Sequence, residues 1–201
     1  MNSKNNSVQK MTRMALLIAL TFILQNLSFR IGTIEMTLGI IPVEIGAILL
    51  GANYGAILGA VMGVASFMQC FGLFVPSPFG AALVGINVFY TLLVCVISRA
   101  LMGYLCGLIF KGLHRFDKTK TLSYAVASTS GAVLNTLFFT SLVIAFFYNT
   151  PYIQDMANFF KTQNVFAFAV AFVGINGIVE AVASLLVGGS VTKILSKVIK
   201  N

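Results

Sequence analysis

The sequence at residues 82–110 is ALVGINVFYTLLVCVISRALMGYLCGLIF, and Arg99 is the only charged side chain in it. A helix needs about 20 consecutive apolar residues to cross the hydrocarbon core of a bilayer. This run is longer than that, and its one charge is costly in lipid unless the side chain faces other helices. The stretch therefore predicts a membrane-spanning helix with a polar residue directed into a helical bundle.

The composition of the whole chain agrees with this prediction. Of its 201 residues, 58% are hydrophobic and only 9% are charged, and the mean hydropathy is +0.95. Soluble domains carry roughly a quarter charged residues, so this chain has too few to cover a water-facing surface. We predict an all-α integral membrane protein, with a single transmembrane domain over 1–201 that binds a small solute, and with 1–10 as a cytoplasmic tail.

Apolar runs of this kind recur along the chain. They predict a bundle of six transmembrane helices at 11–27, 37–50, 54–71, 82–110, 122–147 and 165–195. The run at 37–50 is short for a full span, so we expect a partly interfacial or broken helix there. The connection at 148–164 is expected to be either a lid over an outward-facing cavity or a simple surface loop.

The basic residues predict the orientation, because cytoplasmic loops of membrane proteins are rich in Lys and Arg. With six spans, one face of the membrane receives Lys4, Lys10, Arg13, Lys111, Arg115, Lys118, Lys120, Lys193, Lys197 and Lys200. Only Arg30 and Lys161 fall on the other face. Both termini are therefore predicted to be cytoplasmic, and we attribute the net charge of +8 to topology and anionic lipid, not to nucleic acid.

Glycines recur at a spacing of four in the third and fourth predicted spans. They are Gly51, Gly55, Gly59, Gly63, Gly103 and Gly107. Such smooth stripes let helix backbones approach closely in lipid, where packing must replace the hydrophobic effect. We expect them to pack helices within the chain and not to join two copies of it.

Polar side chains inside the predicted spans are the candidate substrate-binding residues, because such groups are costly in lipid and usually functional. The candidates are Gln69, Asn87, Tyr90, Thr91, Arg99, Asn135, Asn176 and Glu180. Arg99 is suited to clamp a carboxylate, because its guanidinium is always charged and donates two parallel hydrogen bonds. The alternative is an ion pair of Arg99 with Glu44 or Glu180 that only holds helices together.

Several enzyme chemistries lack the residues they need. The chain has no G-x-x-x-x-G-K-[ST] loop and no H-E-x-x-H motif, and its three cysteines have no paired spacing. We therefore expect no catalytic residues, no metal and no cofactor in this chain. Two other classes remain as alternatives: an intramembrane enzyme with Glu44 and Glu180 as acid and base, and a small channel or scaffold.

Three stretches resemble the substrate-binding S component of an energy-coupling factor (ECF) vitamin transporter. They are the pair Ala15 and Ala19, the run IPVEIGAILLG at 41–51 with the glycines after it, and SRALMG at 98–103. The last is similar to a Pro-Arg-Ile-Leu-x-Gly signature of pantothenate-type S components, with Ser98 in place of the proline. The resemblance covers most of the chain.

The resemblance implies a multi-pass protein of a bacterial plasma membrane, with a vitamin pocket near the outer face. Ala15 and Ala19 would dock a transmembrane coupling subunit, and two cytoplasmic ATPase subunits would hydrolyse the ATP. Among vitamins we expect pantothenate, because Arg99 offers its carboxylate a partner. Riboflavin and folate are the alternatives.

Overall fold

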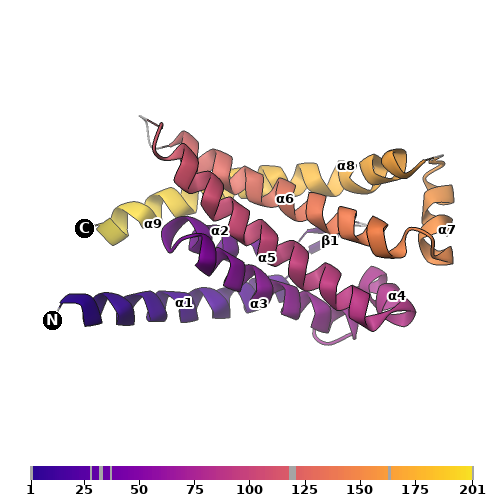
Figure 1. The fold of residues 1–201 in the computed structure, drawn as a ribbon, viewed down its shortest axis with the longest axis horizontal. Helices are drawn as coiled ribbons and strands as arrows, with labels where there is room; N and C mark the ends of the chain where they lie inside the picture. The colour runs from indigo at the N-terminus through magenta and orange to yellow at the C-terminus, as the bar shows by residue number, and fades with distance from the viewer. Residues whose placement is uncertain are drawn as a thin grey trace.

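The structure is a computed structural model that describes residues 2–27, 29–31, 34–36, 38–117, 121–162 and 164–200. Its elements are α1 (Asn2–Asn26), β1 (Phe29–Ile31), β2 (Ile34–Met36), α2 (Ile40–Leu49), α3 (Ala52–Cys70), α4 (Pro78–Ile86), α5 (Val88–Leu113), α6 (Leu122–Phe147), α7 (Pro151–Phe159), α8 (Val165–Ala183), η1 (Ser184–Gly189) and α9 (Ser190–Lys200). The segment η1 is a π-helix that joins α8 to α9 in one long helix (Figure 1).

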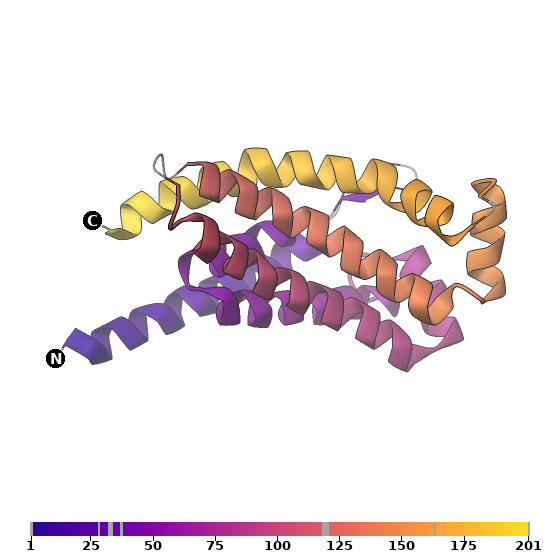
Figure 2. The same cartoon turned by 45° about the horizontal axis from the view of Figure 1, so that its top comes forward.

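The long helices lie along one another in an elongated bundle (Figure 1). Both termini and the connection between α5 and α6 lie at one end, and α4 and α7 lie at the other (Figure 2). Within the described residues, three segments are long and apolar enough to cross a membrane: Val8–Asn26, Val88–Leu113 and Leu122–Phe147. The prediction of an all-helical architecture with membrane-crossing helices is confirmed, apart from one short hairpin.

The shortest predicted span, α2, lies inside the bundle. Every residue from Ile40 to Ile48 is buried, and the helix packs against α1, α3 and α5. The helix has ten residues, so it is short, as the sequence predicted, and neighbouring helices surround it. Gly51 turns the chain from α2 into α3 with φ at 113°, a left-handed conformation that favours glycine. Gly51 is thus a turn residue and does not belong to the packing stripe.

The other glycines of the stripe bring α3 and α5 into backbone contact. A Cβ atom added to Gly59 would overlap the carbonyl oxygen of Arg99, and one added to Gly55 would overlap the carbonyl oxygen of Gly103. Only glycine permits so close an approach, which is how helices pack tightly in lipid. The prediction that these glycines pack helices within the chain is confirmed.

The prediction of one continuous helix over 82–110 is wrong, because the chain breaks at Asn87 between α4 and α5. Asn87 is extended, with φ at −157° and ψ at 108°, and its Oδ1 accepts a hydrogen bond of 3.0 Å from the backbone N–H of Tyr90. Asparagine favours this N-cap position. Hydropathy alone did not reveal the break, because the residues on both sides are equally apolar.

Two short elements occupy the connections near the α4–α7 half of the molecule. Strands β1 and β2 form an antiparallel hairpin with Phe29 opposite Met36, and β2 lies against α8. Helix α7 lies across the end of the bundle (Figure 2). Its Ile153 and Ala157 are buried in an apolar cluster together with Phe168 of α8. The connection at 148–164 therefore closes this end of the bundle with a packed helix.

Candidate functional site

Arg99 of α5 lies in the interior with 7% of its surface exposed. Its Nη1 donates a hydrogen bond of 3.1 Å to the carbonyl oxygen of Cys95, and its guanidinium carbon lies 5.5 Å from the ring centroid of Phe139. Its Nε has no hydrogen-bond partner. No carboxylate pairs with Arg99 within the described residues, so the alternative of an ion pair with Glu44 or Glu180 is not seen there. The guanidinium is free to receive an anionic group.

A second polar group joins α6 to α8. The Nδ2 of Asn135 donates to Oε2 of Glu180 at 3.5 Å, and the hydroxyl of Thr136 lies 3.4 Å from the same oxygen. Asn135 is buried, and its Oδ1 has no hydrogen-bond partner. The side chain of Asn176 lies outside the described part of the structure. This group therefore offers a carboxylate, an amide and a hydroxyl at one place in the bundle.

The two groups lie along one face of α6. Asn135 and Phe139 are four residues apart, so their side chains are neighbours on the helix surface. Arg99 lies over Phe139, and Glu180 contacts Asn135. We call this set of side chains, with Thr136, the Arg99–Glu180 track. It presents a cation at one end and hydrogen-bonding groups with a carboxylate at the other, which suits a ligand with an anionic end and a polar body.

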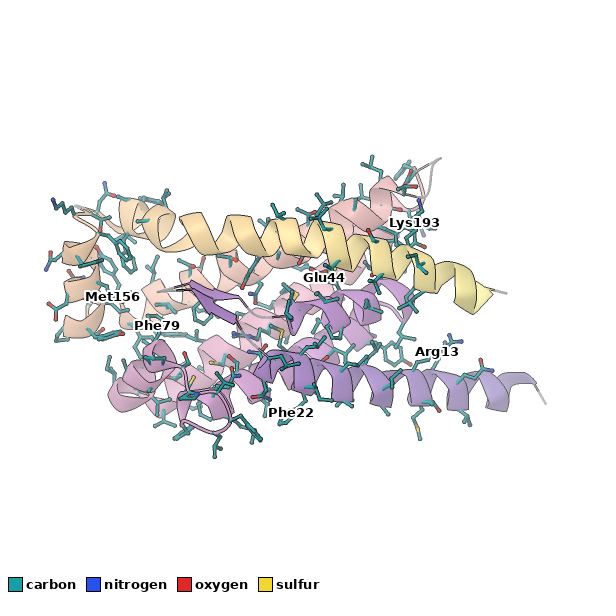
Figure 3. All side chains as sticks on the ribbon, turned by 180° about the vertical axis from the view of Figure 1, so that it is seen from behind. Arg13, Phe22, Glu44, Phe79, Met156 and Lys193 are labelled. Carbon is teal, nitrogen blue, oxygen red and sulfur yellow. The ribbon has the colours of Figure 1, made fainter. Side chains whose placement is uncertain are left out.

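Aromatic rings connect this track to the end of the bundle formed by α4 and α7. The rings of Phe139 and Phe79 have centroids 6.3 Å apart, and those of Phe79 and Tyr152 are 6.2 Å apart. Figure 3 shows Phe79 near this end of the molecule. Neither Phe79, Phe139 nor Thr136 was predicted as a site residue. The spacing of four between Asn135 and Phe139 is the sequence signal that would have placed them on a shared helix face.

Gln69 makes contacts that hold α3 to α1. The Nε2 of Gln25 donates to Oε1 of Gln69 at 3.1 Å, and Nε2 of Gln69 donates to the carbonyl oxygen of Gln25 at 3.0 Å. Both side chains are buried. The structure therefore places Gln69 in a helix–helix contact, although the sequence indicated a substrate-binding residue.

The three candidates near the start of α5 also contact their own helix and its neighbours. Asn87 caps α5, and the buried hydroxyl of Thr91 donates to the carbonyl oxygen of Asn87 at 2.8 Å. The ring of Tyr90 stacks on Phe146 of α6, with centroids 4.8 Å apart. Within the described residues, these contacts do not join Asn87, Tyr90 or Thr91 to the Arg99–Glu180 track.

Ala15 and Ala19 lie on an open face of α1. Both are exposed, and the large apolar side chains exposed on the same helix are Val8, Met11, Leu16, Leu20 and Ile23. In a membrane, exposed apolar surface on a helix is covered by lipid or by another membrane helix. The two alanines keep part of this face smooth, so a partner helix can approach closely there.

Together, an apolar helical bundle, buried polar groups with vacant hydrogen-bonding capacity and a smooth uncovered helix define a class: membrane-embedded proteins that bind a polar solute. The family model described as "ECF transporter, substrate-specific component" matches residues 9–188, and the chain belongs to this family. A comparison with curated proteins found no match. The chain is therefore a membrane protein and a substrate-binding transport subunit, which confirms the resemblance and places it outside the enzymes.

Proposed function

We propose that this chain is the high-affinity binding subunit for uptake of pantothenate across a bacterial plasma membrane. The observation that carries the proposal is the buried guanidinium of Arg99, which has an unpartnered Nε and no carboxylate partner within the part of the chain described. A buried cation without a counter-ion is costly in a membrane interior. An anionic substrate would supply that counter-ion.

The rest of the Arg99–Glu180 track suits the remainder of this vitamin. Pantothenate has a carboxylate at one end, an amide in the middle and two hydroxyl groups at the other end. With its carboxylate on Arg99, its hydroxyls would donate to Oδ1 of Asn135, which lacks a partner, and to Glu180. A charge-assisted hydrogen bond contributes about 1.5–3 kcal/mol, so Arg99 would supply a large share of the affinity.

The proposal extends to topology and partners. Six crossings with cytoplasmic termini agree with the position of both termini and the basic α5–α6 connection at one end of the bundle (Figure 1). The chain carries no nucleotide-binding loop, so ATP hydrolysis would come from two cytoplasmic subunits through a transmembrane coupling subunit. The smooth face at Ala15 and Ala19 would dock that coupling subunit.

Calorimetric titration of the purified full chain with pantothenate, riboflavin and folate tests the proposal. We expect saturable one-to-one binding of pantothenate and no binding of riboflavin or folate. Binding of riboflavin or folate alone would overturn the assignment of the vitamin and of the carboxylate contact. If a folded sample bound no vitamin in a full panel, the proposed vitamin uptake would be wrong.

A further inference from the structure

The carboxyl group of Glu44 lies at the centre of the bundle, outside the Arg99–Glu180 track. It belongs to α2 and lies beneath the long helix formed by α8, η1 and α9 (Figure 3). The side chain is completely buried, and neither of its oxygens has a hydrogen-bond partner in the described structure. Buried polar groups in proteins are nearly always partnered, so this exception needs a physical explanation.

Two serine hydroxyls with the same property lie in the neighbourhood of this carboxylate. Ser128 of α6 and Ser184 of η1 are both completely buried, and neither hydroxyl has a hydrogen-bond partner. Ser184 is close enough to Glu44 to interact with its carboxylate, although the two do not adopt hydrogen-bond geometry. Three separate elements thus each contribute an unpartnered oxygen-bearing side chain to one place.

Two glycines lie against the carboxylate oxygens of Glu44. A Cβ atom on Gly188 would lie 3.4 Å from the Ser128 hydroxyl oxygen and would overlap Oε2 of Glu44. A Cβ atom on Gly131 would lie 2.7 Å from Oε1 of Glu44. Each carboxylate oxygen therefore lies directly against the backbone of a glycine.

The backbone is irregular at the same point. Ser184 and Gly188 both belong to η1, the π-helical segment that interrupts the long helix. Single π-helical turns inside α-helices are rare and occur frequently at functional sites. In membrane transporters, interrupted helices near the middle of the bilayer supply oxygen ligands for small ions. The irregular segment therefore coincides with the unpartnered oxygens.

We propose that Glu44, Ser128 and Ser184 form a binding site for a small monovalent cation, with Na⁺ as the representative ion. All three side chains offer oxygen, the ligand that hard cations prefer, and one carboxylate balances one positive charge. The described residues contain no group of three His, Cys, Asp or Glu side chains suited to a transition metal. A proton would also neutralise Glu44, and the dependence of melting on Na⁺ or on pH distinguishes the two occupants.

The bound cation would hold α2, α6 and η1 together. Removing it would leave an ionised carboxylate buried among three helices, which destabilises a packed interior. A ligand that binds only the folded state raises the melting temperature once its concentration exceeds its dissociation constant, and the rise continues with the logarithm of that concentration. The site can therefore be detected without any vitamin, so its test and that of the proposed uptake function can fail separately.

Thermal unfolding of the full chain in detergent provides the test. The three cysteines are buried and free, so a thiol-reactive dye reports their exposure on unfolding. NaCl is titrated against choline chloride at constant ionic strength and pH. We expect the melting temperature of the wild type to rise with the logarithm of the Na⁺ concentration, and no rise for Glu44→Gln, which keeps the shape of the side chain without its charge.

A pair of serine variants supplies the matched control. Ser128→Ala removes a proposed ligand and should raise the Na⁺ concentration at which the melting temperature begins to rise about tenfold. Ser130→Ala should leave the response unchanged, because that hydroxyl donates to the carbonyl oxygen of Ala127 at 2.7 Å. Comparing Ser128→Ala with Ser130→Ala therefore tests the proposed Na⁺ site even if the Glu44 variant fails to fold.

Three results would overturn the site. The first is equal melting of the wild type in NaCl and choline chloride. The second is a Na⁺ response that survives in Glu44→Gln or is the same in Ser128→Ala and Ser130→Ala. The third is melting that depends on pH and not on Na⁺, which would assign a protonated carboxyl group to Glu44 in place of a cation.

Discussion

The guanidinium of Arg99 lies over the ring of Phe139, with its carbon 5.5 Å from the ring centroid. The aromatic face and the carbonyl oxygen of Cys95 stabilise the charge, and Nε keeps no partner. A cation held in this way is oriented but not neutralised, because a ring quadrupole attracts a cation more weakly than a carboxylate does. The interior of the bundle therefore keeps a positive group available for a ligand.

Replacing Arg99 should weaken the binding of pantothenate. Arg99→Ala removes a charged contact worth about 1.5–3 kcal/mol, so the dissociation constant should rise by about 10-fold to 150-fold in calorimetry. Arg99→Lys keeps the charge without the planar fork, so its dissociation constant should lie between those of the wild type and Arg99→Ala. Arg115→Ala removes an equal charge from the exposed α5–α6 connection and should change nothing. Unchanged affinity in folded Arg99→Ala would exclude Arg99 from the substrate site.

A large side chain at Ala15 should block transport without touching the binding site. Ala15 is exposed on α1, so Ala15→Leu adds bulk only to the face proposed to dock a partner helix. We expect normal vitamin affinity in calorimetry and strongly reduced uptake by cells that contain the complete transporter. Ala15→Ser stays small and should retain uptake. Normal uptake by the leucine variant would refute the docking face.

A methyl group at Gly59 should destabilise the bundle. The added Cβ would overlap the carbonyl oxygen of Arg99, and two helix backbones must separate to admit it. Overpacking of this kind costs about 1–3 kcal/mol, so Gly59→Ala should lower the melting temperature. Gly112→Ala is the control, because nothing lies within 4 Å of its added Cβ. Equal melting of both variants would show that the α3–α5 contact is looser than described.

Substitutions of Gln25 and Gln69 should change the stability of the protein in a coupled way and should leave substrate binding unchanged. Gln69→Ala leaves the buried amide of Gln25 without its partner, at a cost of about 1–3 kcal/mol, while vitamin affinity stays constant. Replacing both residues by leucine should cost less than the two single replacements added together. Lower affinity with unchanged stability in Gln69→Ala would return Gln69 to the substrate site.

Cysteine labelling should reveal the orientation of the bundle. Phe116 lies in the α5–α6 connection and Phe159 at the end of α7, with 85% and 80% of their surfaces exposed. With cytoplasmic termini, a membrane-impermeant thiol reagent should label Phe159→Cys in intact cells, and Phe116→Cys only after the cells are opened. The reverse pattern would invert the proposed topology. The native cysteines are buried, which keeps the background low.

The sequence by itself determined that long helices cross a membrane. The predicted span at 122–147 coincides with α6, and those at 54–71 and 165–195 lie close to α3 and to α8–η1–α9. Hydropathy succeeds here because the cost of placing a segment in lipid is nearly a sum over its own residues. The glycine spacing also predicted close packing of helices within the chain, since a smooth surface is a property of one helix.

Only the tertiary structure decided which polar groups meet. Phe139 beneath Arg99, Gln25 beside Gln69 and the serines around Glu44 join residues that lie more than 35 positions apart in the chain. Their pairing depends on how the helices are ordered and rotated in the bundle. Hydropathy does not encode that arrangement, because it is fixed by packing between surfaces that are distant in sequence.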